Sequence, residues 1–135
     1  MLEAARKSGA RKAERLDVSV PSHCPLLEPV AAALRATLAG MKLEEPQKIY
    51  VGNVKARPLR TAAAVAEDLA GNIAHGVRWH DATTVLEELG CRLFLEMPPG
   101  HVLSDLAREA FPEVKTLAIG QSTLRGALHL AARFA

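Results

Sequence analysis

The sequence is poor in the residues that mark several classes of protein. Aromatic residues make up 4% of it and the formal net charge is only +2. The chain therefore lacks the stacking platforms and the strong basic surplus that nucleic-acid binders use. No apolar run approaches the roughly 18 residues of a membrane span. The only two cysteines, Cys24 and Cys91, match no metal or redox spacing, and we expect them in a reducing cytoplasm.

Charge gathers at one place only, near the start of the chain. Five basic residues lie within the first fifteen positions: Arg6, Lys7, Arg11, Lys12 and Arg15. Acidic residues interrupt them and no apolar stretch follows, so a signal or transit peptide is not predicted. A solvated helix face and turn explain the cluster more simply. Hydrophobic residues make up 49% of 135 residues, which is enough for one ordinary core.

Hydrophobic periodicity after residue 20 predicts alternating helices and strands. Apolar positions recur every three to four residues in 25–40, where Pro25 is tolerated in the first turn and Gly40 ends the helix. Helices are also predicted for 58–73, 80–90, 101–111 and 122–134, and strands for 48–54, 91–97 and 114–119. Pro58 is placed at the start of its helix. This order predicts an α/β fold, with a mostly parallel sheet flanked by helices.

Residues 1–20 fit this alternation poorly. Segment 2–9 is predicted to be the end of a helix that Gly9 stops. The spacing of Leu16, Val18 and Val20 predicts a half-buried strand over 14–20. These elements look like the tail of a different unit, so we expect the chain to start inside a larger protein.

His23 is the strongest candidate for a chemical role. It lies between Pro21 and Pro25, at a predicted strand-to-helix turn, where the ligand and catalytic groups of α/β proteins gather. The flanking prolines restrict the backbone and hold the imidazole in place, as a general base requires. From these residues alone, a structural loop histidine bonded to the backbone remains an alternative.

The other polar motifs have simpler explanations. No two histidines have the spacing of helical zinc ligands, so no metal site is predicted. His129 is predicted near the surface, and His80 at a helix start where it serves as a cap. The stretch "EMPPGHVLSDL" (96–106) lacks the spacing of a phosphate-binding loop. The stretch "GQSTLRG" (120–126) does not match a Gly-x-Ser-x-Gly elbow, so Ser122 is predicted to cap a helix.

Four segments resemble, in this order, the C-terminal third of the malonyl-CoA:acyl-carrier-protein transacylases: "VSVPSHCPLLEPV" (18–30), "VGNV" (51–54), "NIAHGVRW" (72–79) and "EMPPGHVLSDL" (96–106). The first is quite specific, and the resemblance covers nearly the whole chain. The "MPPG" turn and the ending "FPEVKTLAIGQSTLRGAL" (111–128) look most like the epsilon subunit of malonate decarboxylase. That subunit loads malonyl groups onto its own enzyme's carrier protein.

The resemblance implies a Ser-His acyltransferase. Its large subdomain is α/β-hydrolase-like, and a small ferredoxin-like subdomain is inserted in it. On this basis residues 1–20 correspond to a remnant of the small subdomain. Residues 21–135 correspond to the C-terminal part of the large one.

The same resemblance implies roles for three residues. His23 takes the proton from a serine nucleophile and later activates the carrier-protein thiol. In the family a main-chain carbonyl seven positions before the tryptophan of a Val-x-Trp block orients this histidine. Counting back from Trp79 places that carbonyl at Asn72. Asn53 corresponds to an asparagine near the family's site and is expected to line the pocket.

The resemblance implies no bound cofactor. Malonyl-CoA is the substrate, and a phosphopantetheine-type arm belongs to the partner acyl carrier protein; no nucleic-acid or membrane partner is expected. The family's Gly-His-Ser-x-Gly elbow is absent from these 135 residues, as are its glutamine loop and its carboxylate-binding arginine. We therefore expect the chain alone to be inactive and to associate with the missing N-terminal acyltransferase half or with itself.

Two alternatives stay open at this point. One is the same fold from fatty-acid or polyketide synthesis. The other is a non-catalytic subunit that docks on an acyltransferase or a carrier protein.

Overall fold

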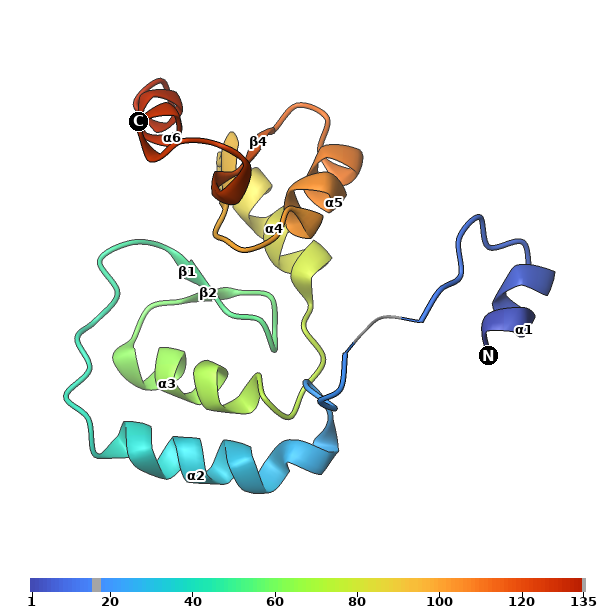
Figure 1. Cartoon of the computed structure of the whole chain (residues 1–135). Coiled ribbons are helices and arrows are strands. Elements are labelled where there is room, and N and C mark those ends of the chain that lie inside the picture. The colour runs from blue at the N-terminus through green and yellow to red at the C-terminus, as the bar shows by residue number, and fades with distance from the viewer. Residues whose placement is uncertain (16–17, 135) are drawn as a thin grey trace.

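The computed structural model describes residues 1–15 and 18–134, and Figure 1 shows their arrangement. The α-helices are α1 (Leu2–Lys7), α2 (Glu28–Ala39), α3 (Ala62–Gly71), α4 (Trp79–Glu88), α5 (Val102–Ala110) and α6 (Leu124–Ala131). The strands are β1 (Tyr50–Val51), β2 (Pro58–Leu59), β3 (Leu93–Glu96) and β4 (Lys115–Ala118). Short 3₁₀ turns, η1 (Pro25–Leu27) and η2 (Ile119–Gln121), precede α2 and α6.

The first helix lies apart from the rest of the molecule (Figure 1). None of the residues of α1 is buried, and Gly9, which follows it, adopts a φ of 87°, a left-handed conformation that ends a helix. The strand expected over 14–20 is wrong for the described residues of that stretch; Leu16 lies outside them. Val18 and Val20 are 65% and 57% exposed, and a strand needs a neighbour to pair with and bury its side chains against.

Helices α2 and α3 pack against each other. Each buries one alanine completely, Ala31 in α2 and Ala70 in α3, and such small side chains allow close approach of two helices. The Arg35 guanidinium donates two hydrogen bonds to the Glu67 carboxylate, at 2.9 and 3.0 Å. The helix predicted over 25–40 is confirmed with a later start, because residues 25–27 form η1 first.

The chain between α2 and α3 differs from the prediction. Pro58 does not begin a helix; it pairs with Val51 in the antiparallel ladder of β1 and β2. The Gly52 amide donates to the Arg57 carbonyl at 3.0 Å, so a short turn reverses the chain, and strands joined in this way run antiparallel. Helix α3 begins at Ala62 because the Thr61 hydroxyl accepts a hydrogen bond from the Ala64 amide.

The expected parallel pairing occurs in the last third of the chain. Strands β3 and β4 are parallel, with Leu93 opposite Lys115 and Glu96 opposite Ala118, and α5, which connects them, packs against both. This arrangement confirms the α/β class, in the form of a small parallel sheet with helices. Ser122 is not the cap of the last helix, because the Thr123 hydroxyl accepts from the Gly126 amide instead.

The described core is made of small side chains. Eight of its nine buried apolar residues are alanines: Ala31, Ala56, Ala70, Ala74, Ala82, Ala107, Val114, Ala118 and Ala127. Among the described residues no large side chain is fully buried, while many leucines, valines and methionines are exposed. In the same residues, no helix is both long and apolar enough to span a bilayer. The molecule therefore has wide apolar surfaces in contact with solvent.

Candidate active site

His23 is tied to the end of α3 by two hydrogen bonds. Its main-chain amide donates to the Ile73 carbonyl at 3.0 Å, and its ring Nδ1 lies 2.6 Å from the Asn72 carbonyl oxygen. A carbonyl only accepts hydrogen bonds, so the ring proton sits on Nδ1 and the lone pair sits on Nε2. The structure thus brings together two residues that lie 49 positions apart, in the contact that the resemblance implies.

The connector around His23 holds an unusual backbone conformation. His23 has a φ of 60°, in the left-handed region that residues other than glycine seldom adopt. The Cys24 thiol donates to the Pro21 carbonyl at 3.0 Å, and Pro25 begins η1 directly afterwards. The ring itself is exposed. The surrounding bonds therefore fix the imidazole of a residue that remains exposed.

The partner atoms of His23 come from the C-terminus of α3. The last carbonyls of a helix have no partner within the helix, and here two carbonyls just past the helix end accept hydrogen bonds from His23. The Asn72 side chain takes no part, because its Oδ1 is buried without a hydrogen-bond partner. It is therefore the main chain of Asn72 that orients the ring.

Asn53 lies in the turn after β1, and a buried carboxylate fixes that turn. Asp68, on α3, is only 8% exposed and accepts from the amides of Asn53, at 2.9 Å, and Val54, at 3.0 Å. Gly52 is required there, because a Cβ atom would come within 2.5 Å of Asp68 Oδ1. The Asn53 carbonyl in turn accepts from the Arg78 amide at 3.0 Å, just before α4.

A hollow of about 270 Å³ opens beside this turn. Its lining includes Gly52, Val54, Lys55, Asp68 and His75. Asn53 and His23 are not among its lining residues. The structure thus fixes Asn53 to α3 through Asp68, and the end of the same helix holds His23. Neither Asn53 nor His23 lines this hollow.

Comparison with known proteins shows which family of enzymes this sequence is similar to. No family model matches the chain. It is 31% identical over 117 residues to a malonyl-CoA:acyl carrier protein transacylase of Bacillus subtilis, which covers 87% of this chain and 37% of the relative. The Escherichia coli K12 transacylase is 30% identical over 128 residues, covering 94% of this chain and 41% of the relative. The chain is homologous to the C-terminal portion of the malonyl-CoA:acyl carrier protein transacylases.

Solved transacylase structures confirm the fold. The enzyme from Xanthomonas oryzae pv. oryzae matches with a TM-score of 0.83 and 32% identity, covering 97% of this chain and 41% of that one. The enzyme from Acinetobacter baumannii matches with a TM-score of 0.84 and 31% identity, covering 99% and 43%. A malonyl-transacylase in complex with a type II polyketide synthase acyl-carrier protein gives 0.83 and 31%, covering 98% and 42%. The chain thus spans about two fifths of the length of these transacylases.

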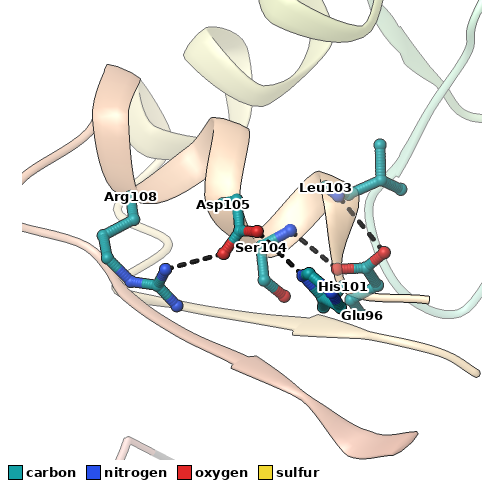
Figure 2. A network of polar contacts seen from close by, with 6 residues as sticks. All are labelled: Glu96, His101, Leu103, Ser104, Asp105 and Arg108. Carbon is teal, nitrogen blue, oxygen red and sulfur yellow. Dashed lines mark hydrogen bonds and ion pairs between the residues drawn. The ribbon is translucent and has the colours of Figure 1, made fainter. Parts of the chain in front are cut away.

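A second imidazole of this transacylase-like chain is also held by a hydrogen bond at Nδ1. At the start of α5, His101 Nδ1 donates to the Asp105 carboxylate at 2.8 Å, and Arg108 donates to the other oxygen of that carboxylate at 2.8 Å (Figure 2). These bonds, with that from His101 the stronger influence, hold the pKa of Asp105 below its usual range. Sequence reasoning missed this pair, although the spacing of four residues on a predicted helix could have indicated it.

The segment "EMPPGHVLSDL" also contains a helix cap that sequence reasoning missed. The Glu96 carboxylate accepts from the Leu103 amide at 3.2 Å and from the Ser104 amide at 2.7 Å (Figure 2). Burial raises the pKa of Glu96, but hydrogen bonds from Ser104 and Leu103 outweigh that effect and lower it. The segment is thus a capped helix start, as expected for a turn rather than a phosphate loop.

Two of the remaining histidines have structural contacts, and His129 is exposed, as predicted. His75 Nδ1 lies 2.8 Å from the Gly71 carbonyl. His80 does not cap α4, whose N-cap is Arg78; its ring stacks on Phe111 with centroids 5.7 Å apart. Of these rings, only His23 combines a partner distant in sequence with a strained backbone.

Proposed function

We propose that this chain supplies the general base of a malonyl transfer that proceeds through an acyl-serine. The observation that carries the proposal is the 2.6 Å contact from His23 Nδ1 to the Asn72 carbonyl. It leaves Nε2 of an exposed ring with a lone pair ready to accept a proton. Homology to transacylases supports the choice of reaction.

In each half of this reaction His23 accepts one proton and then returns it. Nε2 accepts the serine hydroxyl proton while the serine oxygen attacks the thioester carbonyl of malonyl-CoA. The carbon–sulfur bond breaks, and His23 returns the proton to the departing CoA sulfur. In the second half, His23 takes the proton of the carrier-protein thiol. The thiol attacks the acyl-serine, and the serine oxygen leaves with that proton.

The nucleophile belongs to polypeptide outside these residues, because no Gly-His-Ser-x-Gly sequence occurs in the 135. Asn72 serves as a positioning residue through its main chain, and Asn53 as a substrate contact. We assign 1–20 to the small subdomain and 21–135 to the large one. The separation of α1 from the remaining elements supports this division.

Within this function we favour the malonate decarboxylase type, acting in the cytoplasm. The support is the sequence of the 97–100 turn and of the 111–128 ending. The partner would then be the carrier subunit of that enzyme rather than the acyl carrier protein of fatty-acid or polyketide synthesis. No bound cofactor is required, since the phosphopantetheine-type arm arrives on the carrier protein.

The test is malonyl transfer by an assembled enzyme. The 135-residue chain is co-expressed with the part of the Bacillus subtilis transacylase that precedes the matched region. Radiolabelled malonyl-CoA is then offered with either of the two carrier proteins. We expect transfer by the complex and none by the chain alone, because members of a catalytic unit act together. Preference for the decarboxylase carrier would support the finer assignment.

Two results would contradict the proposal. Turnover by the chain alone would show that the serine is not needed. Transfer that continues in the complex after His23→Ala would show that another group is the base. A stable complex that never transfers malonyl would instead favour the alternative of a non-catalytic docking subunit.

A further inference from the structure

The linker between α3 and α4 carries the carbonyl that orients the His23 ring, and it is anchored at both ends. Its first residue is Asn72, whose amide donates to the Asp68 carbonyl at 2.8 Å. Its last residue is Arg78, whose amide donates to the Asn53 carbonyl at 3.0 Å. The place of the Asn72 carbonyl therefore depends both on the end of α3 and on the turn that contains Asn53.

The anchor at Arg78 depends on a carboxylate of α3. The amides of Asn53 and Val54 donate to the Asp68 carboxylate at 2.9 and 3.0 Å, and hydrogen bonds to a charged acceptor are roughly twice as strong as neutral ones. Asp68 is only 8% exposed, so little water competes for its oxygens. A Cβ atom on Gly52 would lie 2.5 Å from Asp68 Oδ1. The turn and the helix therefore fit closely around this carboxylate.

Asp68 thus acts on the two ends of the linker through different parts of the residue. Its main-chain carbonyl holds Asn72 as part of the helix, and a change of the Asp68 side chain keeps that bond. Its carboxylate holds Arg78 by way of the turn. Replacing the side chain therefore releases one end of the linker and leaves the other end in place.

We propose that Asp68 is a positioning residue for His23. By fixing the turn, its carboxylate keeps the linker in the shape that places the Asn72 carbonyl 2.6 Å from His23 Nδ1. When the turn is released, the carbonyl leaves this place for part of the time, and the ring proton is then no longer confined to Nδ1. The effect on the ring follows from these contacts alone, whereas its consequence for catalysis rests on the proposed function.

A role of Asp68 in stability alone is the rival explanation, so the test needs a matched control. Thr61 caps the start of α3, at the opposite end of the helix from the contacts of His23, and its hydroxyl accepts from the Ala64 amide at 3.2 Å. Thr61→Ala destabilises the same helix by removing its cap, but it leaves the turn bonded to Asp68. The control therefore separates a loss of stability from a loss of position.

The first readout is nitrogen NMR of the His23 ring in the 135-residue chain, at mildly alkaline pH where an ordinary imidazole is neutral. The unchanged chain should show one tautomer, with the proton on Nδ1. Asp68→Asn keeps the size of the side chain but sets an N–H donor against one of the two backbone amides, and it should give a mixture of both tautomers. Gly52→Ala should give the same mixture, because the new Cβ atom displaces the carboxylate. Thr61→Ala should keep the single tautomer.

The second readout is malonyl transfer by the co-expressed complex. Asp68→Asn should lower kcat by about tenfold to a hundredfold, since a misplacement of about 1 Å costs up to about 10²-fold. KM should change by less than about threefold, because the ring moves protons and does not hold the substrate. Thr61→Ala should leave both constants within about twofold, since the site of the folded enzyme is unchanged.

Three results would overturn the inference. They are a single tautomer in the folded turn variants, an equal mixture of tautomers in Thr61→Ala, and unfolding of both turn variants while Thr61→Ala stays folded, which would give Asp68 a role in stability alone. If only one of Asp68→Asn and Gly52→Ala folds, that variant decides. If the tautomers change as expected but the complex never transfers malonyl, the proposed function fails and this inference stands. Transfer that depends on His23, with a single tautomer in both turn variants, would do the reverse.

Discussion

His23 and His101 are both held at Nδ1, but by partners of different kinds. His23 bonds to a neutral main-chain carbonyl 49 residues away. His101 bonds to a carboxylate four residues away at the start of α5. Both rings are exposed. A surface helix forms the second contact from its own spacing, whereas the first exists only once the whole α2–α3 region has folded.

His23 and His101 also differ in backbone conformation. His23 has a φ of 60°, a conformation that costs about 1–2 kcal/mol for a residue with a side chain. His101 has a φ of −144° and carries no such strain. A strained residue persists only where its surroundings hold it firmly, and such residues gather at functional sites. The comparison therefore favours His23 over His101 for the proposed catalytic role.

The largest effect should come from removing each ring in turn from the assembled enzyme. His23→Ala should lower kcat/KM for malonyl transfer by roughly a thousandfold, since a positioned general base contributes about 10²–10⁴. His101→Ala should change it by less than about threefold, because only a surface pair is lost. Steady-state assays with malonyl-CoA and carrier protein measure both. Equal losses in the two variants would remove the distinction between the rings.

The next effect compares the carboxylates of the two regions. Asp68→Ala leaves the part-buried amides of Asn53 and Val54 without their acceptor, which should cost about 2–3 kcal/mol. Asp105→Ala removes an exposed carboxylate and should change stability little. Urea unfolding of the 135-residue chain gives the free energies. Similar losses for both variants would mean that the turn at Asn53 does not depend on Asp68.

A smaller effect concerns the titration of Asp105. Its pKa is lowered in the folded chain, mainly by the hydrogen bond from His101. The stability that this gives is present above the usual pKa of an aspartate and is lost as pH falls through the lowered value. His101→Ala should therefore raise the pKa of Asp105 towards its ordinary value, which carboxyl-carbon NMR measures. Arg108→Ala should act in the same direction, and an unchanged titration in both variants would contradict the network in Figure 2.

The sequence could predict most of the helices and little of the site. The helix over 25–40 and that over 80–90 followed from apolar spacing and from Gly40 and Gly90, since these signals are local. The prediction that Pro58 begins a helix was wrong, because the turn after β1 brings Pro58 opposite Val51 in a strand pair. Local pattern is silent wherever tertiary pairing decides the structure.

Among the contacts of the histidines, too, local pairs could be predicted from the sequence and tertiary pairs could not. Nothing in the spacing of His23 and Asn72 indicates that they touch, and only the resemblance to transacylases pointed to the pair. Neither the spacing nor the resemblance predicted the hydrogen bonds that the amides of Asn53 and Val54 donate to Asp68. These bonds form only when the turn after β1 folds against α3. The His101–Asp105 pair was accessible from spacing alone.

The smallest effect should come from the residue that orients His23. Asn72→Ala keeps the main-chain carbonyl, and the side chain that it removes has an Oδ1 without a partner. The transfer rate of the assembled enzyme should stay within about threefold, because the orienting contact survives. Nitrogen NMR of the imidazole should still report the proton on Nδ1 of His23. A large loss of activity with an unchanged ring tautomer would instead place the Asn72 side chain in contact with substrate, and the role of the carbonyl would then need another test.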